Sequence, residues 1–445
     1  MQPEKNDQDV NKPSRRDFLR NSSLIASVTL IAPAFLSACT PSAPDDSASD
    51  PNAEGSPAGG PIIIGHQPEL TGVASVFGFW NDRAAQAAVI RVNEMGGIGG
   101  REVELVTRDS GSSGDQGVDA MRRLILDDEA DFVLGSIVAN INKPSAALAG
   151  ELETLYFPSD DVPVIAGEPD ANRFVFRLGH NTKIKAQASY QWALDNLGKK
   201  WSFLTSDTTW GNSQQEFFTE LIEANGGEVV SAVVAPLLSE DFIPLFNQVD
   251  LDETEVLYHS FFGGAAIRFN GQAATAGIFD KVKILASIGV LEGLDAADLP
   301  DGQTYISEFP RSLDQIPEEL RDYNVELRAL VGVDDEGYAT DGSGAILTEE
   351  HYWVPWVNIH LLKETIEASG WQSKEDNDAL ISAMEGFEAK ASLDYPSGDF
   401  IIRPEDHRAF RDYFIEQTVG GRLEVVAKLP KEDGFYEPPV DYTAE

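Results

Sequence analysis

The sequence predicts an α/β fold with two lobes, each built on a parallel sheet. Short apolar runs at 62–65 and 103–106 flank an amphipathic run at 79–97, and the same alternation resumes after residue 200. Such alternation is typical of parallel sheets with helices on both faces. The part that can fold, about 375 residues from 61 onward, is too long for one ordinary core, which favours two lobes.

The first half of this part predicts strands and helices in turn. In the run 79–97, Ala85, Ala88, Val89 and Val92 recur at helical spacing, and Gly96 supplies a left-handed stop. We expect strands at 62–65, 103–106, 131–134 and 162–166, and helices at 79–97, 115–126 and 144–155.

The second half repeats the pattern and then changes. We expect strands at 201–205, 229–234, 256–259 and 282–286, with helices at 212–224 and 265–276. From about 313 the pattern shifts to longer helices, notably 349–368 and 374–388. The crossovers between parallel strands should be right-handed.

Ligands of such folds sit at the carboxyl ends of the strands. Several large aromatic residues are expected on loops there: Phe77, Trp80, Trp210 and the pair 261–262. Their placement in both halves favours a cleft that holds a small solute from two sides. The loops concerned are 66–78, 109–114, 135–142 and 166–170, then 206–211, 260–264 and 287–292.

Motifs for catalysis, nucleotides or metals are not supported. The glycines at 96–100 close a helix instead of opening one, and GSSG at 111–114 has no partner lysine, so a plain flexible loop is favoured there over a ligand contact. No Gly-x-Ser-x-Gly elbow occurs, the six histidines lie far apart, and the acidic stretch 334–342 lacks the calcium-loop order. We expect a binding protein, not an enzyme, with no metal and no cofactor.

The N-terminus carries export features. SRRDFLR at 14–20 precedes an apolar run too short to span a bilayer and resembles a twin-arginine signal. LSAC at 36–39 resembles a lipoprotein box and contains the single cysteine. We expect residues 1–38 to be removed and Cys39 to be acylated, which anchors the protein outside the cytoplasmic membrane; a buried, inert cysteine is the alternative. Residues 39–60, rich in Pro, Ser, Ala, Gly and Asp, should form a disordered tether.

The charge is strongly acidic, with 74 acidic against 33 basic residues. Removing residues 1–38, which carry a net +1, lowers the net charge from −41 to −42. Such a surface argues against binding to nucleic acid or anionic lipid. Because salt at ~1 M shortens the Debye length to about 3 Å, this charge favours a halophilic origin, with a merely acidic exported protein as the alternative.

Several stretches resemble one family in the right order over about 61–430. IIIGHQPELTG, AAVIRVNEMGGIGGREVELVTRD and FLTSDTTWGNSQQEFFTELIEANGGEVV are similar to type I periplasmic solute-binding proteins of the branched-chain amino-acid cluster, as are VPVIAG with NRFVFRLG and the late SGDFIIRPEDHRAF. The resemblance implies two Rossmann-like lobes joined by a three-strand hinge, with crossings near 179, 308 and 397. The lobes would be 61–179 plus 308–396 and 180–307 plus 397–435.

The resemblance also implies a role. Such a protein captures a small solute and presents it to the membrane permease of an ABC importer, as a monomer or weak dimer. A sensor or receptor module of the same fold, or less readily an exported enzyme, is the alternative.

Site residues carry over unevenly. The loop 135–142, which receives the ligand carboxylate in this family, offers Ser136 and asparagines, and Trp210 replaces the family tyrosine. No acid stands at 288–289 to meet a ligand ammonium, so Glu292, Glu168 and Glu308 are the candidates, and an amide, urea, organic acid or aromatic solute stays open beside an amino acid. The candidate ligand-binding residues are Thr71, Phe77, Trp80, Ser136, Asn140, Ala166, Gly167, Glu168, Trp210, Phe261 and Glu308.

Overall fold

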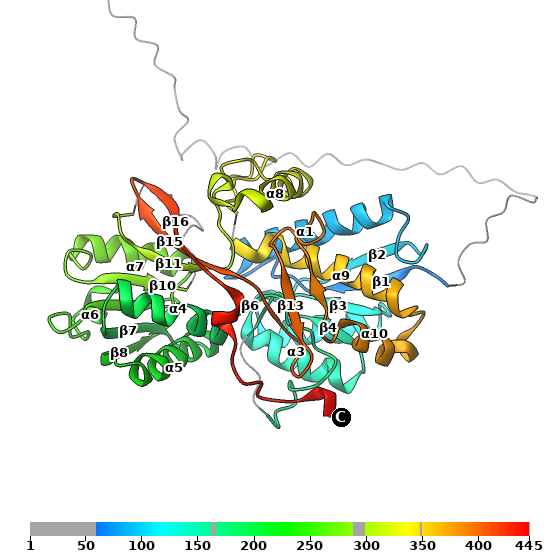
Figure 1. The fold of residues 1–445 in the computed structure, drawn as a ribbon, viewed down its shortest axis with the longest axis horizontal. Helices are drawn as coiled ribbons and strands as arrows, with labels where there is room; N and C mark the ends of the chain where they lie inside the picture. Colours follow the sequence, from blue (N-terminus) through cyan, green and yellow to red (C-terminus); the bar gives the residue numbers. More distant parts are fainter. Residues whose placement is uncertain (1–58, 162–165, 288–298, 348, 445) are drawn as a thin grey trace, which may run out of the picture. The chain divides into compact units, whose positions relative to one another are not determined.

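The computed structural model describes residues 59–161, 166–287, 299–347 and 349–444 (Figure 1). The predicted export signal, Cys39 and nearly all of the predicted tether lie outside these ranges, as do Glu292 and most of the strand predicted at 162–166. Among the helices within these ranges, none combines the length and the apolar character that crossing a membrane requires.

The first sheet is parallel, with strand order β2-β1-β3-β4. β1 (Ile62–His66) pairs with β2 (Val103–Thr107) on one side and β3 (Phe132–Leu134) on the other, and β4 (Leu155–Phe157) pairs with β3. The prediction of a parallel sheet in this half of the chain is confirmed.

Helices pack on both faces of this sheet. Ile62 and Ile64 of β1 point into a core with Trp80 of α1 (Ser75–Glu94), whereas Ile63 packs with the opposite core. The first core also takes residues of helices far along the chain, and α9 lies against α1 (Figure 1). These helices are α8 (Glu318–Val331), α9 (Val354–Ser369) and α10 (Asn377–Met384), while α2 (Gly114–Leu126) and α3 (Ala139–Glu151) cover the other face.

The second sheet has the order β16-β15-β11-β10-β9-β7-β8. Strands β7 to β11 run parallel, and β15 and β16 add an antiparallel edge. The strands are β7 (Lys200–Ser206), β8 (Glu228–Ala235), β9 (Val256–His259), β10 (Lys283–Ala286), β11 (Thr304–Ser307), β15 (Tyr413–Val419) and β16 (Arg422–Leu429).

Two further cores cover the faces of the second sheet. α4 (Thr182–Asn196) and α5 (Thr209–Ala224) pack on one face, and α6 (Ile243–Phe246) with α7 (Gly263–Thr275) on the other. Both sheets belong to one compact unit, Gly55–Glu445. The buried residues of the first core come from two stretches of the chain, 62–178 and 309–414. The lobe boundaries predicted at 179, 308 and 397 stay predictions.

Three element predictions need correction. The helix predicted at 79–97 begins earlier, at Ser75, so Phe77 and Trp80 lie in the first turns of α1 and not on a loop. The helix predicted at 144–155 is α3, which starts at Ala139 and carries Pro144 inside it. The buried triplet Leu155–Phe157, whose first residue was predicted to end that helix, pairs in register with β3 as β4, and the strand predicted at 162–166 lies mostly outside the described residues.

Other element boundaries follow simple rules. Gly96 has φ +99° directly after α1, and Gly226 has φ +82° after α5, as glycine allows and other residues resist. The long helix predicted at 349–368 is split into the short η4 (Glu349–Tyr352) and α9, and that predicted at 374–388 into η5 (Lys374–Asp376) and α10. In α9, Pro355 stands in the first turn, where its missing N–H costs nothing.

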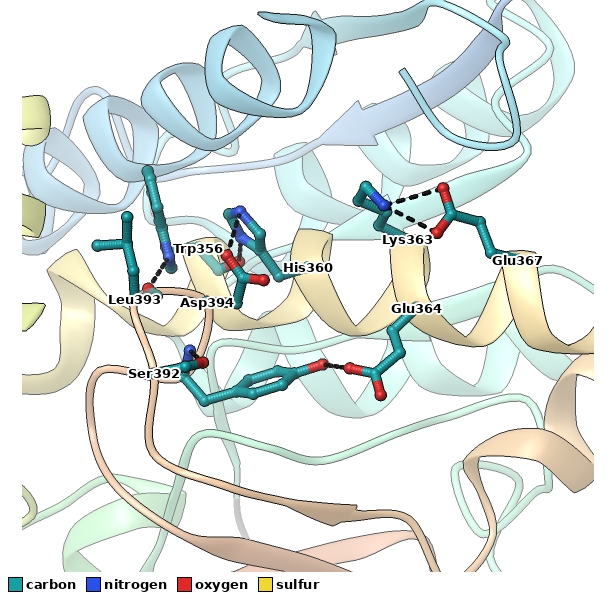
Figure 2. A network of polar contacts seen from close by, with 9 residues as sticks. Trp356, His360, Lys363, Glu364, Glu367, Ser392, Leu393 and Asp394 are labelled. Carbon is teal, nitrogen blue, oxygen red and sulfur yellow. Dashed lines mark hydrogen bonds and ion pairs between the residues drawn. The ribbon is translucent and has the colours of Figure 1, made fainter. Parts of the chain in front are cut away.

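A polar network fastens the segment 390–395 to α9 (Figure 2). The Trp356 indole N–H donates to the Leu393 carbonyl at 2.8 Å, and His360 Nε2 lies 3.4 Å from Asp394. The Tyr395 hydroxyl donates to Glu364 at 2.7 Å. These contacts fix the connection between the first two strands of a small antiparallel sheet, which consists of β12 (Glu388–Ala389), β13 (Phe400–Arg403) and β14 (Arg408–Phe410).

Candidate functional site

The topology places two crevices where strand order reverses. β1 lies between β2 and β3, and β7 lies between β8 and β9, so the chain leaves each of these central strands toward opposite sides. At such switch points the loops after the strands diverge, and ligands bind in the gap. The two crevices lie at the carboxyl ends of β1 and β3 and of β7 and β9.

One pocket of about 390 Å³ takes residues from both crevices. This volume suits a small molecule. Five of the seven predicted loops contribute: 66–78, 109–114, 135–142, 206–211 and 260–264. The lining residues are Val73, Ala74, Phe77, Ser112, Ile137, Val138, Ala139, Asn140, Asp160, Asp207, Thr208, Thr209, Trp210, Leu237, Phe262 and His351.

Aromatic rings form much of the pocket wall. Phe262 stands edge-on to both Phe77 and Trp210, with ring centroids 5.8 Å apart in each pair. The ring of His351, contributed by η4, lies 4.6 Å from that of Phe77. Phe77 belongs to α1, which packs on the first sheet, and Phe262 follows β9 of the second sheet, so the rings join the two lobes of the fold. Edge-to-face pairs of this kind add about 1 kcal/mol beyond burial.

Helix N-termini supply the positive end of the pocket. The N-cap residues Ala74 of α1, Val138 of α3 and Phe262 of α7 make no side-chain cap hydrogen bond. All three line the pocket. The first backbone N–H groups of a helix have no partner within it, and the helix dipole adds to their positive character. An anionic group of a solute would be stabilised here.

Two acidic residues belong to the same wall. Asp160 of β5 (Asp160–Asp161) and Asp207, which follows β7, line the pocket. The amide N–H of Asp207 donates to Ala235 at 2.7 Å, which fixes the backbone of that loop. The pocket therefore offers sites for both signs of charge around an apolar centre.

Three predicted site residues are brought together: Phe77, Asn140 and Trp210 all line the pocket. Ser136 lies just behind the wall, fully buried, and its hydroxyl donates to Glu69. Thr71 fastens its own loop by donating to Asp109 at 2.6 Å. Desolvation would raise the pKa of Asp109, but hydrogen bonds from Thr71, Gly111 and Leu70 lower it below its ordinary value.

The remaining predicted residues lie away from the pocket wall. Trp80 is buried in the first core, and its indole N–H donates to the Ile346 carbonyl at 2.7 Å. Phe261 packs against Phe242 and Phe269 in the core under α7. Glu308 is buried, and its carboxylate accepts from the Tyr413 hydroxyl at 3.3 Å.

The segment 166–168 also lies outside the wall. Ala166 and Gly167 are exposed, and Glu168 pairs with Lys143 at 2.5 Å. Hydrogen bonding from Lys143 lowers the pKa of Glu168, so this acid is committed to an exposed ion pair.

Sequence reasoning missed several lining residues. Ser112 lies in the loop 111–114, for which a flexible loop was favoured over a ligand contact. Phe262 directly follows Phe261, which was the predicted ligand-binding residue. Asp207 and Thr208 had a readable signal, because they directly follow a buried strand. His351 had none, since it reaches the pocket from a segment remote in sequence. No group of three metal-ligating side chains is arranged for a metal ion among the residues that the structure describes.

Comparisons with known proteins point to one family. A family model described as periplasmic binding protein matches residues 61–422. The Leu/Ile/Val-binding protein BraC3 of Rhizobium johnstonii is 28% identical over 206 residues, 46% of this chain and 54% of that protein. A chemotactic signal transduction substrate-binding protein, BasB of Halobacterium salinarum, is 29% identical over 134 residues, 29% of this chain and 32% of that protein. The matched part of the chain thus covers about half, or less, of the length of these curated relatives.

Solved structures share the fold. A solute-binding protein of an ABC transporter from Rhodopseudomonas palustris, in complex with 3,4-dihydroxybenzoic acid, superposes with a TM-score of 0.69 at 21% identity, covering 83% of this chain and 97% of that one. The predicted fold class is confirmed, and the family supports the prediction of a binding protein instead of an enzyme. Because the family model spans most of the sequence, the chain belongs to the periplasmic binding protein family.

Proposed function

We propose that this chain is the solute-binding component of an ABC importer and that its solute is a small α-amino acid with an apolar side chain. The observation that carries the proposal is the composition of the pocket: aromatic walls from both sheets surround a space that has helix N-termini and carboxylates within it. A solute touching both sheets favours a closed form, which a permease can distinguish from the open one.

The charges favour a zwitterion. The N-termini of α1 and α3 suit a carboxylate, and the side chains of Ser112 and Asn140 can donate hydrogen bonds beside them. Asp207 suits an ammonium group. A carboxylate without an ammonium would leave Asp207 facing an anion, so an amino acid fits better than a benzoate. In this proposal, Asp207 takes the role of the acid that is missing at 288–289.

The apolar part of the solute has its own place. Phe77, Trp210, Phe262 and Leu237 surround the centre of the pocket. Burying a branched aliphatic side chain against such rings contributes about 2 kcal/mol. The name of the relative BraC3, a Leu/Ile/Val-binding protein, agrees with this solute class.

A thermal-shift panel at ~2–3 M salt tests the proposal, because a ligand stabilises the state that binds it. The panel contains leucine, isoleucine, valine, benzoate, 3,4-dihydroxybenzoate, urea and an amide. We expect the three amino acids to raise the melting temperature and urea and the amide to leave it unchanged. A shift with the benzoates alone would replace the amino-acid assignment, and no shift with any member would contradict the proposal.

The substitution Asp207→Asn separates the two carboxylic solutes. It should weaken leucine binding by at least tenfold in calorimetry, because the ammonium group loses its partner. Any residual benzoate binding should stay equal or strengthen. Asp195→Asn on α4, outside the pocket lining, is the control. Equal leucine affinity in the wild type and the Asp207 variant would remove this residue from the site.

We also propose that Cys39 is acylated after export and anchors the protein to the outer face of the membrane. The support is the twin-arginine-like segment and the LSAC sequence in order at the N-terminus. Membrane fractionation of the chain expressed in a lipoprotein-processing host tests this, with Cys39→Ser expected to move it to the soluble fraction. Equal membrane association of both forms would contradict anchoring through this residue.

A sensor role is the second candidate, favoured by the name of the relative BasB, a chemotactic signal transduction substrate-binding protein. The pocket chemistry is the same for both roles. Uptake and chemotaxis assays in a strain lacking this gene distinguish them: loss of amino-acid uptake supports the importer, and loss of chemotaxis alone supports the sensor.

A further inference from the structure

One buried carboxyl group stands behind the apolar wall of the pocket. Glu69 follows β1 in the chain and its side chain is fully buried. It accepts a hydrogen bond from Ser110 at 3.1 Å and another from the Ser136 hydroxyl. The backbone N–H of Ile137 points at the same carboxyl group, 3.3 Å from Oε2. Glu69 therefore ties together the loops that follow β1, β2 and β3.

The residues that bond to Glu69 are part of the pocket wall or directly precede it. Ile137 and Val138 line the pocket, and Val138 is the N-cap of α3. The Val138 N–H donates to the Ser136 hydroxyl at 3.0 Å, so Val138 is held by Glu69 through Ser136. The position of Ile137 depends on Glu69 directly. The wall and the start of α3 thus share one buried anchor.

The surroundings of Glu69 are poor in opposite charge. Burial raises the pKa of Glu69 to about 8, and the nearby carboxylate of Asp109 acts in the same direction. The neighbouring elements carry few other titratable groups: His66 at the end of β1 lies 3.9 Å from Asp82 of α1, and Lys143 of α3 pairs with Glu168. The carboxyl group of Glu69 therefore holds its proton more tightly than an exposed glutamate does.

We propose that Glu69 is a positioning residue for the solute pocket, whose carboxyl group fixes residues 136–138 and with them the apolar wall and the start of α3. The inference rests on the proposed function for its effect on affinity. Ionisation of Glu69 places a negative charge behind the helix end that receives the solute carboxylate, so affinity should fall as the pH rises through about 8.

Hydrogen–deuterium exchange of the ligand-free chain tests the positioning role without any solute. Glu69→Ala should raise exchange in a peptide covering 134–142 by tenfold or more, because the N–H groups of 137 and 138 lose their fixed geometry. Glu69→Gln keeps an acceptor oxygen and should restore protection to within threefold of the wild type. Ser136→Ala removes the hydroxyl that connects Glu69 to Val138, so exchange in the same peptide should rise, but by less than in Glu69→Ala. This variant tests the inference even if Glu69→Ala does not fold.

Asp109→Asn is the matched control. Asp109 accepts hydrogen bonds from the backbone N–H groups of 70, 71 and 111, which lie in the loops after β1 and β2 and not in the loop after β3. It should open the peptide around 70–72 and leave 134–142 protected. Unchanged exchange at 134–142 in Glu69→Ala, or opening in Glu69→Gln as wide as in Glu69→Ala, would overturn the inference.

The pH profile of leucine affinity is the second readout. In the wild type, affinity should fall by tenfold or more between pH 7 and pH 9, and in Glu69→Gln the profile should be flat over that range. A slope as steep in Glu69→Gln as in the wild type would show that another group titrates. If leucine does not bind at all, the proposed solute class fails, while the exchange experiment still decides the role of Glu69.

Discussion

At the scale of single residues, neighbouring phenylalanines divide between core and pocket. Phe261 is buried in the core, where the centroid of its ring lies 4.8 Å from that of Phe242. Phe262 instead lies in the pocket, with its ring edge-on to those of Phe77 and Trp210. Successive side chains of an extended segment point to opposite sides, so two adjacent large residues cannot share one environment. The sequence located the pair, and the direction of each ring came from the structure.

Trp210 should be a strong contributor to binding. It is 8% exposed, lines the pocket and meets Phe262 edge-on. Trp210→Ala should weaken leucine binding more than tenfold, roughly 1.4 kcal/mol. Trp192→Ala, on α4 and outside the pocket lining, should bind normally. Calorimetry at ~2–3 M salt measures both, and an unchanged affinity in the first variant would exclude Trp210 from the site.

Glu416 should make stability depend on pH. It is buried in β15, and desolvation raises its pKa to about 7 in the folded chain from an ordinary value of 4.5. Between these values the folded state keeps a proton that the unfolded state has lost, so stability is fully present below about pH 4.5 and falls as the pH rises to about 7. At about 1.4 kcal/mol per pKa unit, the difference between 4.5 and about 7 corresponds to a loss of at most about 3.5 kcal/mol.

Glu416→Gln should remove this part of the slope. Denaturant unfolding at pH 5 and pH 8 in constant salt should show a smaller difference between the two pH values in the variant than in the wild type. Glu424→Gln, on the neighbouring β16, should leave the difference unchanged. If the wild type and Glu416→Gln lose the same stability between pH 5 and pH 8, the carboxyl group does not titrate in this window.

At the scale of elements, helix starts determine the site. The N-cap residues of α1, α3, α5 and α7 all line the pocket, because each helix follows a parallel strand at the same edge of its sheet. The sequence placed the start of α1 four residues late and that of α3 five residues late, since its apolar pattern becomes regular only after the first turn. These errors hid the fact that Phe77 belongs to a helix and not to a loop.

Among these helix starts, α5 carries a side-chain cap. The Thr208 hydroxyl accepts from the Gly211 N–H at 2.9 Å. Thr208→Ala should therefore lower the free energy of unfolding by about 1 kcal/mol. Thr209→Ala, one residue further and not a cap, should change it by less than about 0.5 kcal/mol. Urea unfolding in constant salt compares the two, and equal losses would show that the hydroxyl of Thr208 does not act as a cap.

At the scale of the whole molecule, charge should couple stability to salt. The net charge of −41 repels itself in dilute buffer, where the Debye length is about 10 Å at 0.1 M and about 3 Å at 1 M. The melting temperature should be higher in ~2–3 M KCl than in ~0.1 M KCl. Chloride is preferred over sulfate, because sulfate stabilises most proteins by exclusion from their surface. Equal melting temperatures in both solutions would contradict the halophilic interpretation.

The sequence by itself determined the alternation of strands and helices, the parallel sheets and five loops of the pocket, because these follow from local periodicity and from the edge rule of parallel sheets. It also located Phe77, Asn140 and Trp210. Tertiary structure decided the rest. His351 enters the pocket from a distant segment, and Glu69 is buried where the loops after three strands converge. Contacts between segments remote in the chain leave no period or spacing in the sequence from which they could be predicted.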